Sequence, residues 1–203
     1  MKKHLISIAA LLVLFCPATF TQVGIKGGVN MSSIAAEADD IEEKNAILGW
    51  QAGLMLTVPV HDWFSIQPEV LYIRKGSKHE FLGSDVEFRL DYIEVPVLAM
   101  LKPGGGPVVL EVGPQFSYLA NAKTTFKNGP FGEDITVDED RDNYEPLDVG
   151  VVLGIGLSFE KFLFDLRYTR GFNSIDKART IGNTEYSSGA RNFNLQASIG
   201  VYF

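Results

Sequence analysis

Eight segments of the chain alternate apolar and polar side chains: residues 23–32, 48–58, 64–75, 92–102, 108–120, 147–159, 162–172 and 191–203. In the last segment every second residue from Phe193 to Phe203 is apolar, and Asn194, Gln196 and Ser198 lie between them. Because successive residues of a strand point to opposite faces, each segment predicts a strand with one apolar and one polar face. Two structures fit this pattern: a soluble sheet packed on a core, and a barrel whose apolar face meets lipid.

The connections between the segments alternate in length. Residues 59–63, 103–107 and 160–161 form short links, and the longer, polar links are residues 33–46, 76–86, 123–146 and 174–190. Outer-membrane barrels have an even number of strands, short turns at the periplasmic end and long loops outside the cell. A soluble sandwich has no reason to gather every long loop at one end. The pattern therefore favours an all-β fold, an eight-stranded antiparallel up-and-down transmembrane β-barrel with short periplasmic turns and long extracellular loops.

The polar faces of the segments suit the inside of a narrow barrel better than a surface in water. Their large side chains are few and alternate with small residues such as Gly150 and Gly154, which leave room for long neighbours. The predicted inward residues are Lys26, Gln51, Gln67, Glu69, Glu94, Glu111, Gln115, Asp148, Asp165, Arg167, Asn194 and Gln196. Eight strands enclose space only for side chains, so we expect no open pore.

Aromatic residues gather near the ends of the segments. We assign to the end with the short turns Trp63, Phe64, Phe159, Phe162, Tyr202 and Phe203, and to the end with the long loops Tyr72, Tyr92, Tyr118 and Tyr168. Two aromatic girdles around an aliphatic band are expected where a barrel meets both lipid interfaces. The apolar faces are therefore predicted to face lipid.

The first residues have the layout of a secretory signal peptide. A basic start precedes an apolar run over residues 5–15, and small or polar residues follow. This run is too short for a membrane helix. Cleavage after Ala18 or after Thr21 fits the pattern, and we favour Thr21. Residues 1–21 are then the signal peptide, and residues 22–203 form the barrel domain.

Charge and cysteine content exclude several functions. The formal charge of −7 includes Lys2 and Lys3, so the domain after the signal peptide carries −9, which argues against nucleic acid. Cys16 is the single cysteine and leaves with the signal peptide, so we expect no disulfide, thiolate metal site or cysteine nucleophile. Phe15 is too bulky for a lipoprotein signal that would acylate Cys16. No later run of about 20 apolar residues offers a membrane helix, so crossing a membrane requires a closed barrel.

Five stretches carry a family resemblance: "FSIQPEVLYIRKG" (64–76), "LDYIEVPVLAMLK" (90–102), "GPQFSYL" (113–119), "LDVGVVLGIGL" (147–157) and "FLFDLRYTRGFNSI" (162–175). They are similar to stretches of the outer-membrane β-barrel proteins of Bacteroidetes called the PorT family, and they contain no catalytic signature. The resemblance implies the barrel fold and an outer-membrane location. The name-giving member is associated with a secretion system and gliding. Phe203 also resembles the C-terminal signal that the barrel assembly machinery recognises.

One charged constellation falls on the predicted inward faces near mid-strand: Glu69, Glu94, Glu111, Asp165 and Arg167. Several carboxylates around an arginine suggest either a proton or cation site, or a structural network. A charge buried in a narrow barrel must be paired, and one arginine bonds two carboxylates at once. We therefore favour the structural network.

An acidic stretch in the third long link has some features of a calcium-binding loop. Asp138, Asp140 and Asp142 have the alternate spacing of a calcium loop. An EF-hand loop would have Gly and Glu where this chain has Asn143 and Val149. A solvated acidic loop is the favoured interpretation, and we predict no metal site.

The sequence thus predicts an outer membrane barrel without enzymatic activity or cofactor, which has a structural, adhesive or secretion-accessory role through its extracellular loops. Its expected partners are outer membrane lipid, the barrel assembly machinery and a secretion or surface protein. Two alternatives stay open. One is a soluble, periplasmic, lipocalin-like binder of small molecules. The other is a barrel enzyme acting on lipid or peptide, with His79, Ser84 and Asp85 in the second long link as its catalytic set.

Overall fold

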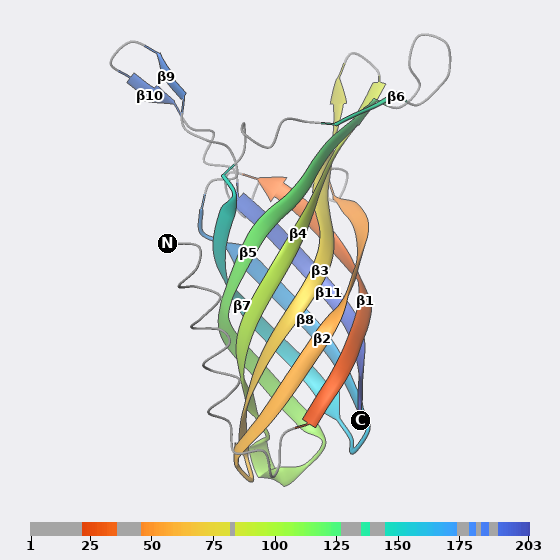
Figure 1. Cartoon of the computed structure of the whole chain (residues 1–203), viewed down its shortest axis with the longest axis vertical. Coiled ribbons are helices and arrows are strands. Elements are labelled where there is room, and N and C mark those ends of the chain that lie inside the picture. The colour runs from red at the N-terminus through yellow and green to blue at the C-terminus, as the bar shows by residue number, and fades with distance from the viewer. Residues whose placement is uncertain are drawn as a thin grey trace.

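Long β-strands make up most of the protein (Figure 1). The structure is a computed structural model, and it describes residues 22–35, 46–81, 84–126, 135–138, 145–173, 179–181, 184–186 and 191–203. The predicted signal peptide, residues 1–21, lies outside them. Among the described residues, no helix is long and apolar enough to cross a membrane.

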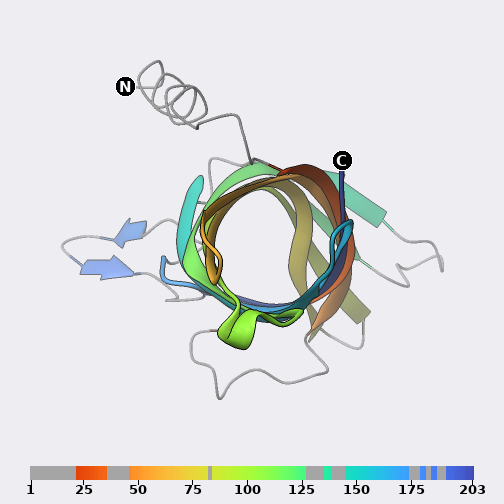
Figure 2. The same cartoon turned by 90° about the horizontal axis from the view of Figure 1, so that it is seen from below.

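Eight antiparallel strands close into a barrel, as the sequence predicts. They are β1 (Gln22–Ala35), β2 (Ile47–His61), β3 (Phe64–Phe81), β4 (Ser84–Leu101), β5 (Val108–Phe126), β7 (Leu147–Ser158), β8 (Phe162–Gly171) and β11 (Arg191–Tyr202). Each strand pairs with its neighbour along the chain, and β1 pairs with β11 from Gly24↔Tyr202 to Ala35↔Arg191. Seen along its axis, the sheet is a closed ring (Figure 2). The predicted up-and-down barrel is confirmed.

The described connections are short at one end of the barrel, here called the turn end; the opposite end is the loop end. Residues 62–63 form the turn between β2 and β3, and the 3-10 helix η3 (Pro103–Gly105) lies between β4 and β5. Gly104 and Gly105 have φ values of 71° and 68°, a backbone conformation that favours glycine. At the loop end, β6 (Ile135–Asp138) pairs with the end of β5, and β9 (Arg179–Ile181) with β10 (Thr184–Tyr186).

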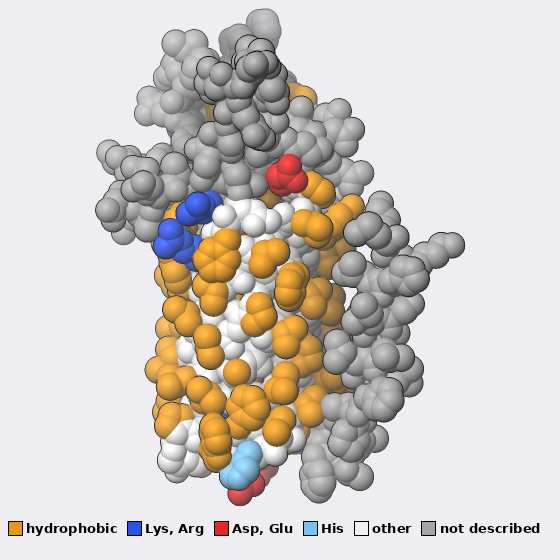
Figure 3. Space-filling model, turned by 90° about the vertical axis from the view of Figure 1, so that its left-hand side faces the viewer, with side chains coloured by type: hydrophobic (Ala, Val, Ile, Leu, Met, Phe, Trp, Pro, Cys, Tyr) orange, Lys and Arg blue, Asp and Glu red, His pale blue; other side chains and the backbone are white. Residues whose placement is uncertain are grey.

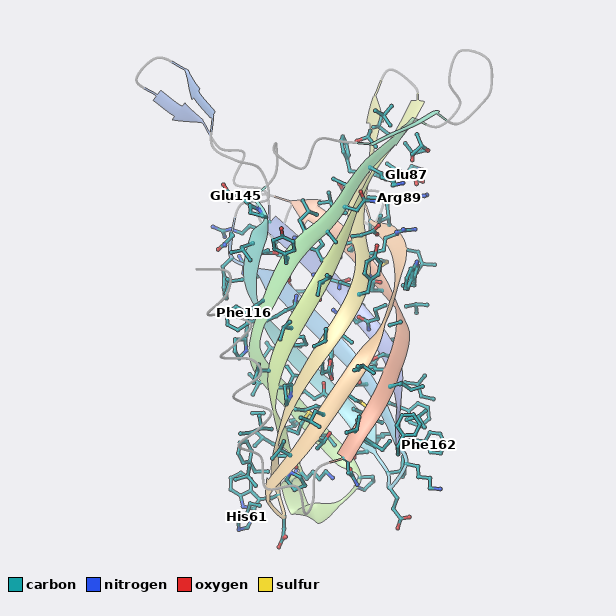
Figure 4. All side chains as sticks on the ribbon, in the orientation of Figure 1. His61, Glu87, Arg89, Phe116, Glu145 and Phe162 are labelled. Carbon is teal, nitrogen blue, oxygen red and sulfur yellow. The ribbon has the colours of Figure 1, made fainter. Side chains whose placement is uncertain are left out.

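The second link predicted as a long loop, residues 76–86, is instead mostly paired strand. β3 continues to Phe81 and β4 begins at Ser84, and their register runs without a break from Arg74↔Asp91 to Phe81↔Ser84. β3, β4 and β5 have 18, 18 and 19 residues, whereas crossing a membrane takes about 9–11. The residues of β3, β4 and β5 beyond those needed to cross the membrane extend above the barrel at the loop end, where Figure 4 labels Glu87 and Arg89. We call this part, residues 76–81, 84–91, 121–126 and 135–138, the projecting sheet.

Exposed apolar side chains lie on all eight strands of the barrel and form a belt around it. Figure 3 shows one face of this belt. Outward residues such as Leu54, Leu153 and Leu166 are more than half exposed, while the twelve predicted inward residues are all buried. Figure 4 labels Phe116 on the outside of the wall and Phe162 near the turn end. The exposed aromatic residues at the two ends include Trp63, Phe159 and Phe203, and Trp50, Tyr118 and Tyr168. Burial of apolar residues against lipid accounts for this inverted arrangement.

Two aromatic residues were assigned to the wrong face by the sequence analysis. Tyr92 and Tyr202 are 1% and 7% exposed and lie inside the barrel, not in the girdles. Tyr92 alternates with the outward Ile93, and the Tyr202 hydroxyl bonds to Thr57 and Gln67. A place near a strand end does not decide the face, because only the alternation along the strand does.

Leu166→Arg should destabilise the barrel more than Val60→Arg. The two side chains are 57% and 58% exposed, but Leu166 lies between Phe162 and Tyr168, and Val60 lies beside the β2–β3 turn. An arginine on the lipid face costs about 2–4 kcal/mol at mid-membrane and about 0–1 kcal/mol near an interface. Urea unfolding of each variant in lipid vesicles measures the difference. Equal losses at both positions would contradict this assignment of the membrane band.

Candidate functional site

The interior of the barrel is layered along its axis. Near the turn end lies an apolar plug, formed by Met55, Leu98, Met100, Val109, Val152, Leu163 and Tyr202. Near the loop end lies a second apolar cluster, formed by Ile73, Leu90, Tyr92, Leu119 and Ala122. Charged and polar side chains occupy the inward positions of the same strands between them. The alternation predicted the polar inward positions but not the apolar clusters, although Met55, Leu98 and Met100 alternate in phase with the inward residues Gln51 and Glu94.

Arg167, on β8, is the centre of the charged layer. It is 1% exposed, and its Nη1 and Nη2 atoms donate to Glu69 Oε2 and Oε1 at 2.7 and 2.9 Å. Its Nε atom donates to Glu111 Oε2 at 2.5 Å and lies 3.3 Å from Asp165 Oδ1. Such forked pairing of one guanidinium with two carboxylates is strong and geometrically specific. Arg167 therefore ties β8 to β3 and β5 across the barrel interior.

Lys26, on β1, is a second cation of this layer. Its Nζ atom lies 2.6 Å from Asp165 Oδ2 and 3.3 Å from Glu69 Oε1. Asp165 also accepts a hydrogen bond of 2.6 Å from the Ser198 hydroxyl. Two cations thus face three carboxylates, all of them buried. We call Lys26, Glu69, Glu111, Asp165 and Arg167 the charged layer.

Glycines on neighbouring strands make room for the long side chains of the charged layer. Gly154 pairs with Glu111 on one side and with Arg167 on the other. A Cβ atom at Gly154 would lie 3.0 Å from Arg167 Cγ and 3.1 Å from Glu111 Oε2. Lys26 is likewise flanked by Gly53 and Gly200. Gly154, on β7, thus leaves the space in which Glu111 of β5 and Arg167 of β8 meet.

Glu94 belongs to a different site, nearer the loop end. It forms an ion pair with Lys75 and accepts a hydrogen bond of 3.1 Å from the Ser117 hydroxyl. The Lys75 ammonium also lies 5.7 Å from the centre of the Tyr92 ring. The structure therefore brings together four of the five residues of the predicted constellation and places Glu94 with Lys75, which the sequence analysis did not single out. The fifth member of the charged layer is Lys26 instead of Glu94.

The other candidate sites fall largely outside the described side chains. Asp138 ends β6, while Asp140 and Asp142 lie outside the described residues. His79, Ser84 and Asp85 lie in the paired β3 and β4 strands, but their side chains are not among those described. Within the part of the chain that the structure describes, no group of three or more histidine, cysteine or acidic residues has the geometry of a metal site.

Comparison with known proteins gives the family of this barrel. Residues 19–177 match the family described as "Outer membrane protein beta-barrel domain". The chain belongs to this family. The exposed apolar belt and the family together place the barrel in the outer membrane, in contact with its lipid. No curated protein matches the chain.

The solved structures that resemble this outer membrane barrel domain share little sequence with it. Neisserial surface protein A has a TM-score of 0.51 at 16% identity, with 90% of this chain and 97% of that chain covered. The attachment invasion locus protein Ail of Yersinia pestis, in complex with the heparin analogue sucrose octasulfate, has a TM-score of 0.46 at 15% identity, covering 90% and 99%. The outer membrane protease OmpT from Escherichia coli has a TM-score of 0.30 at 10% identity, covering 90% and 96%.

The soluble, lipocalin-like alternative is wrong for this outer membrane barrel. A soluble barrel of eight strands has an apolar interior and a polar outside. Here the outside carries Leu48, Leu147 and Leu195 at 77%, 58% and 50% exposure, while Glu69 and Arg167 are 1% exposed inside. The family and the outer membrane location agree with that distribution.

Arg167→Met should destabilise the barrel by about 3–5 kcal/mol, because it leaves buried carboxylates without their counter-charge. Arg89→Met is the matched control: Arg89 pairs with Glu87 at 2.6 Å on the projecting sheet and is 39% exposed, so its loss should cost about 0.2–1 kcal/mol. Unfolding in urea, with both variants refolded in the same vesicles, gives the two values. Similar losses for both arginines would show that the charged layer does not act as a buried network.

Proposed function

We propose that this protein is a non-enzymatic outer membrane barrel that acts through its extracellular end. The observation that carries the proposal is the contrast between the two parts of the molecule. The barrel interior is occupied by apolar clusters and by a buried, ion-paired layer around Arg167. The strands β3, β4 and β5 extend well beyond what a membrane crossing needs. A filled interior supports a structural role for the barrel, and the extended strands support a surface role for the loop end.

The projecting sheet supports presentation of a partner-binding surface. It is built from paired strands, with Lys123↔Asp138 to Phe126↔Ile135 joining β6 to β5. The Thr125 and Thr136 hydroxyls lie 3.1 Å apart across this pair. Paired strands hold the sheet at a fixed position relative to the barrel, so a partner would meet a pre-ordered surface, which lowers the entropic cost of binding. The protein would thus serve as a scaffold for adhesion or for assembly with a secretion or surface protein.

The resemblance to the PorT family supports the secretion-accessory form of this proposal. The similar stretches lie in β3, β4, β5, β7 and β8, which build the barrel wall. We propose membership of that group and a role beside a secretion system, with the projecting sheet as the contact surface. Adhesion to an external surface is the second form of the same role.

Shortening the projecting sheet tests the proposal. Replacing residues 77–88 by Asn-Gly joins the paired residues Gly76 and Arg89 through a two-residue hairpin turn. This variant should stay in the outer membrane and still migrate faster on a gel before boiling than after, because the barrel is intact. It should lose adhesion or protein secretion to the level of a strain that lacks the whole chain. The control variant replaces Glu160 and Lys161, at the turn end, by the same two residues.

The outcomes of this experiment separate the alternatives. Normal adhesion and secretion in the shortened variant, with a clear defect in the deletion strain, would contradict a role for the projecting sheet. An enzymatic role would instead predict an activity on lipid or peptide that His79→Ala abolishes while the charge swap Glu87→Arg with Arg89→Glu preserves it.

We also propose that export removes residues 1–21 and that Phe203 is read by the barrel assembly machinery. Phe203 is 82% exposed at the turn end, and its backbone nitrogen donates to the Val23 carbonyl at 2.9 Å. That main-chain bond does not need the ring. The exposed ring therefore contributes little to the folded barrel and is free to act during assembly.

Phe203→Ala should lower the amount of folded protein in the outer membrane while the surviving molecules unfold nearly as before. Phe159→Ala is the matched control, because Phe159 is an exposed aromatic residue at the same end. The amount of folded protein in membranes, measured as the gel band that migrates faster before boiling than after (the heat-modifiable band), reports assembly. Urea unfolding of the purified protein measures stability. A stability loss in Phe203→Ala without an assembly defect would overturn the assignment. Mass determination of the exported chain tests whether it begins at Gln22.

A further inference from the structure

Among the residues that the structure describes, two arginines at the loop end have no carboxylate partner. Arg170 lies near the end of β8, and Arg191 begins β11. The other arginines whose side chains the structure describes are all paired: Arg74 with Asp91, Arg89 with Glu87, and Arg167 within the charged layer. Arg170 and Arg191 form no ion pair within the described part of the chain. Arg170 and Arg191, on the paired strands β8 and β11, therefore differ from the other described arginines in lacking a carboxylate partner.

Both arginines belong to the outward face of adjacent strands. Arg170 pairs with Phe193 across the ladder, and Arg191 lies two residues from Phe193 on the same face. Residues diagonal to each other on a strand pair lie within reach of long side chains. The Arg170 guanidinium lies 5.5 Å from the centre of the Phe193 ring, which fixes its position. Its Nε atom is buried and has no hydrogen-bond partner.

Arg170 and Arg191 lie along the membrane normal at the level of the lipid headgroups. Arg170 follows Tyr168, an outward residue of the girdle at the loop end that is 39% exposed. Two strand residues advance about 7 Å. The headgroup layer adds roughly 5–8 Å on each side of the hydrocarbon core. Arg170 therefore lies within that layer.

We propose that Arg170 and Arg191 bind the phosphate of a lipid in the outer leaflet. A guanidinium offers a planar fork of donors that matches phosphate oxygens, and such charge-assisted bonds are strong. The Arg170 guanidinium, which lies over the Phe193 ring, supplies one cation, and Arg191 supplies the second. Directly below, Tyr168 and Leu195 pair with each other on the lipid face and offer an apolar surface to the acyl chains.

The combination of donors and apolar surface favours a lipid over free phosphate, because a soluble anion would use only the guanidinium groups. The site is also local. On β3, at the corresponding height two residues beyond the exposed Tyr72, Arg74 is already neutralised by Asp91 at 2.7 Å. Within the described side chains, the β3–β4 side of the barrel therefore lacks a comparable pair, and one lipid would be held at β8–β11. This inference does not depend on the role of the projecting sheet.

Lipid binding to the purified barrel tests the proposal. The barrel in detergent is titrated with phosphorylated lipid A, with the same lipid A after phosphatase treatment, and with inorganic phosphate, and bound lipid is counted by native mass spectrometry. The wild type should bind the phosphorylated lipid. The double variant Arg170→Gln with Arg191→Gln should bind it at least about tenfold more weakly, because it loses both charge-assisted contacts with the phosphate. Arg89→Gln, on the projecting sheet, should bind it within about twofold of the wild type.

Each result decides the proposal. Equal affinity of the double variant and the wild type would overturn it, as would equal binding of the dephosphorylated lipid. Binding of inorganic phosphate as tightly as the lipid would overturn the lipid assignment and leave a phosphate site. Arg191→Gln alone leaves the contact of Arg170 with Phe193 in place, so this variant gives the test if the double variant fails to fold. It should weaken lipid binding while the heat-modifiable band stays unchanged.

Discussion

The pairing of backbone groups in lipid determines the architecture of this protein. In hydrocarbon an unpaired amide or carbonyl has no water to bond, so a sheet that crosses a membrane must close on itself. The pairing of β1 with β11 provides that closure, over the full length of β11 and from Gly24 to the end of β1. Once the sheet is closed, its outer face must be apolar, and its inner face encloses a space only as wide as side chains can fill. Both the exposed belt and the filled interior follow from this requirement.

The narrow interior then decides which side chains are compatible with one another. A charge inside it has no bulk water, so it needs a partner within bonding distance. Arg167 meets this need with Glu69 and Glu111, and Lys26 meets it with Asp165. The glycines on the intervening strands matter as much as the charges, since Gly154 leaves the space in which Arg167 and Glu111 approach each other. Small and charged residues thus act as one unit across three strands.

Alternation along single strands was enough to predict the faces of the barrel, because one face meets lipid and the other does not. It failed for the predicted loop 76–86, whose sequence does not alternate strictly although β3 and β4 continue as paired strands through most of it. Contacts between strands need the register as well. Glu94 was grouped with Arg167 because both lie inward near mid-strand, but the register places Leu71, not Glu69, opposite Glu94. Lys75 thereby becomes its partner, which no pattern within one strand reveals.

The unequal strand lengths give the barrel a front and a back within the plane of the membrane. β3, β4 and β5 have 18 or 19 residues, whereas β8 and β11 have 10 and 12. In the closed ring, β4 lies across from β11, and β3 lies across from β8. The side formed by the long strands β3, β4 and β5 therefore faces away from the side formed by β8 and β11, which carries Arg170 and Arg191. A neighbour diffusing in the outer membrane would meet protein well above the bilayer on one side and only lipid-level surface on the other, so lateral encounters with this molecule depend on its rotation about the membrane normal.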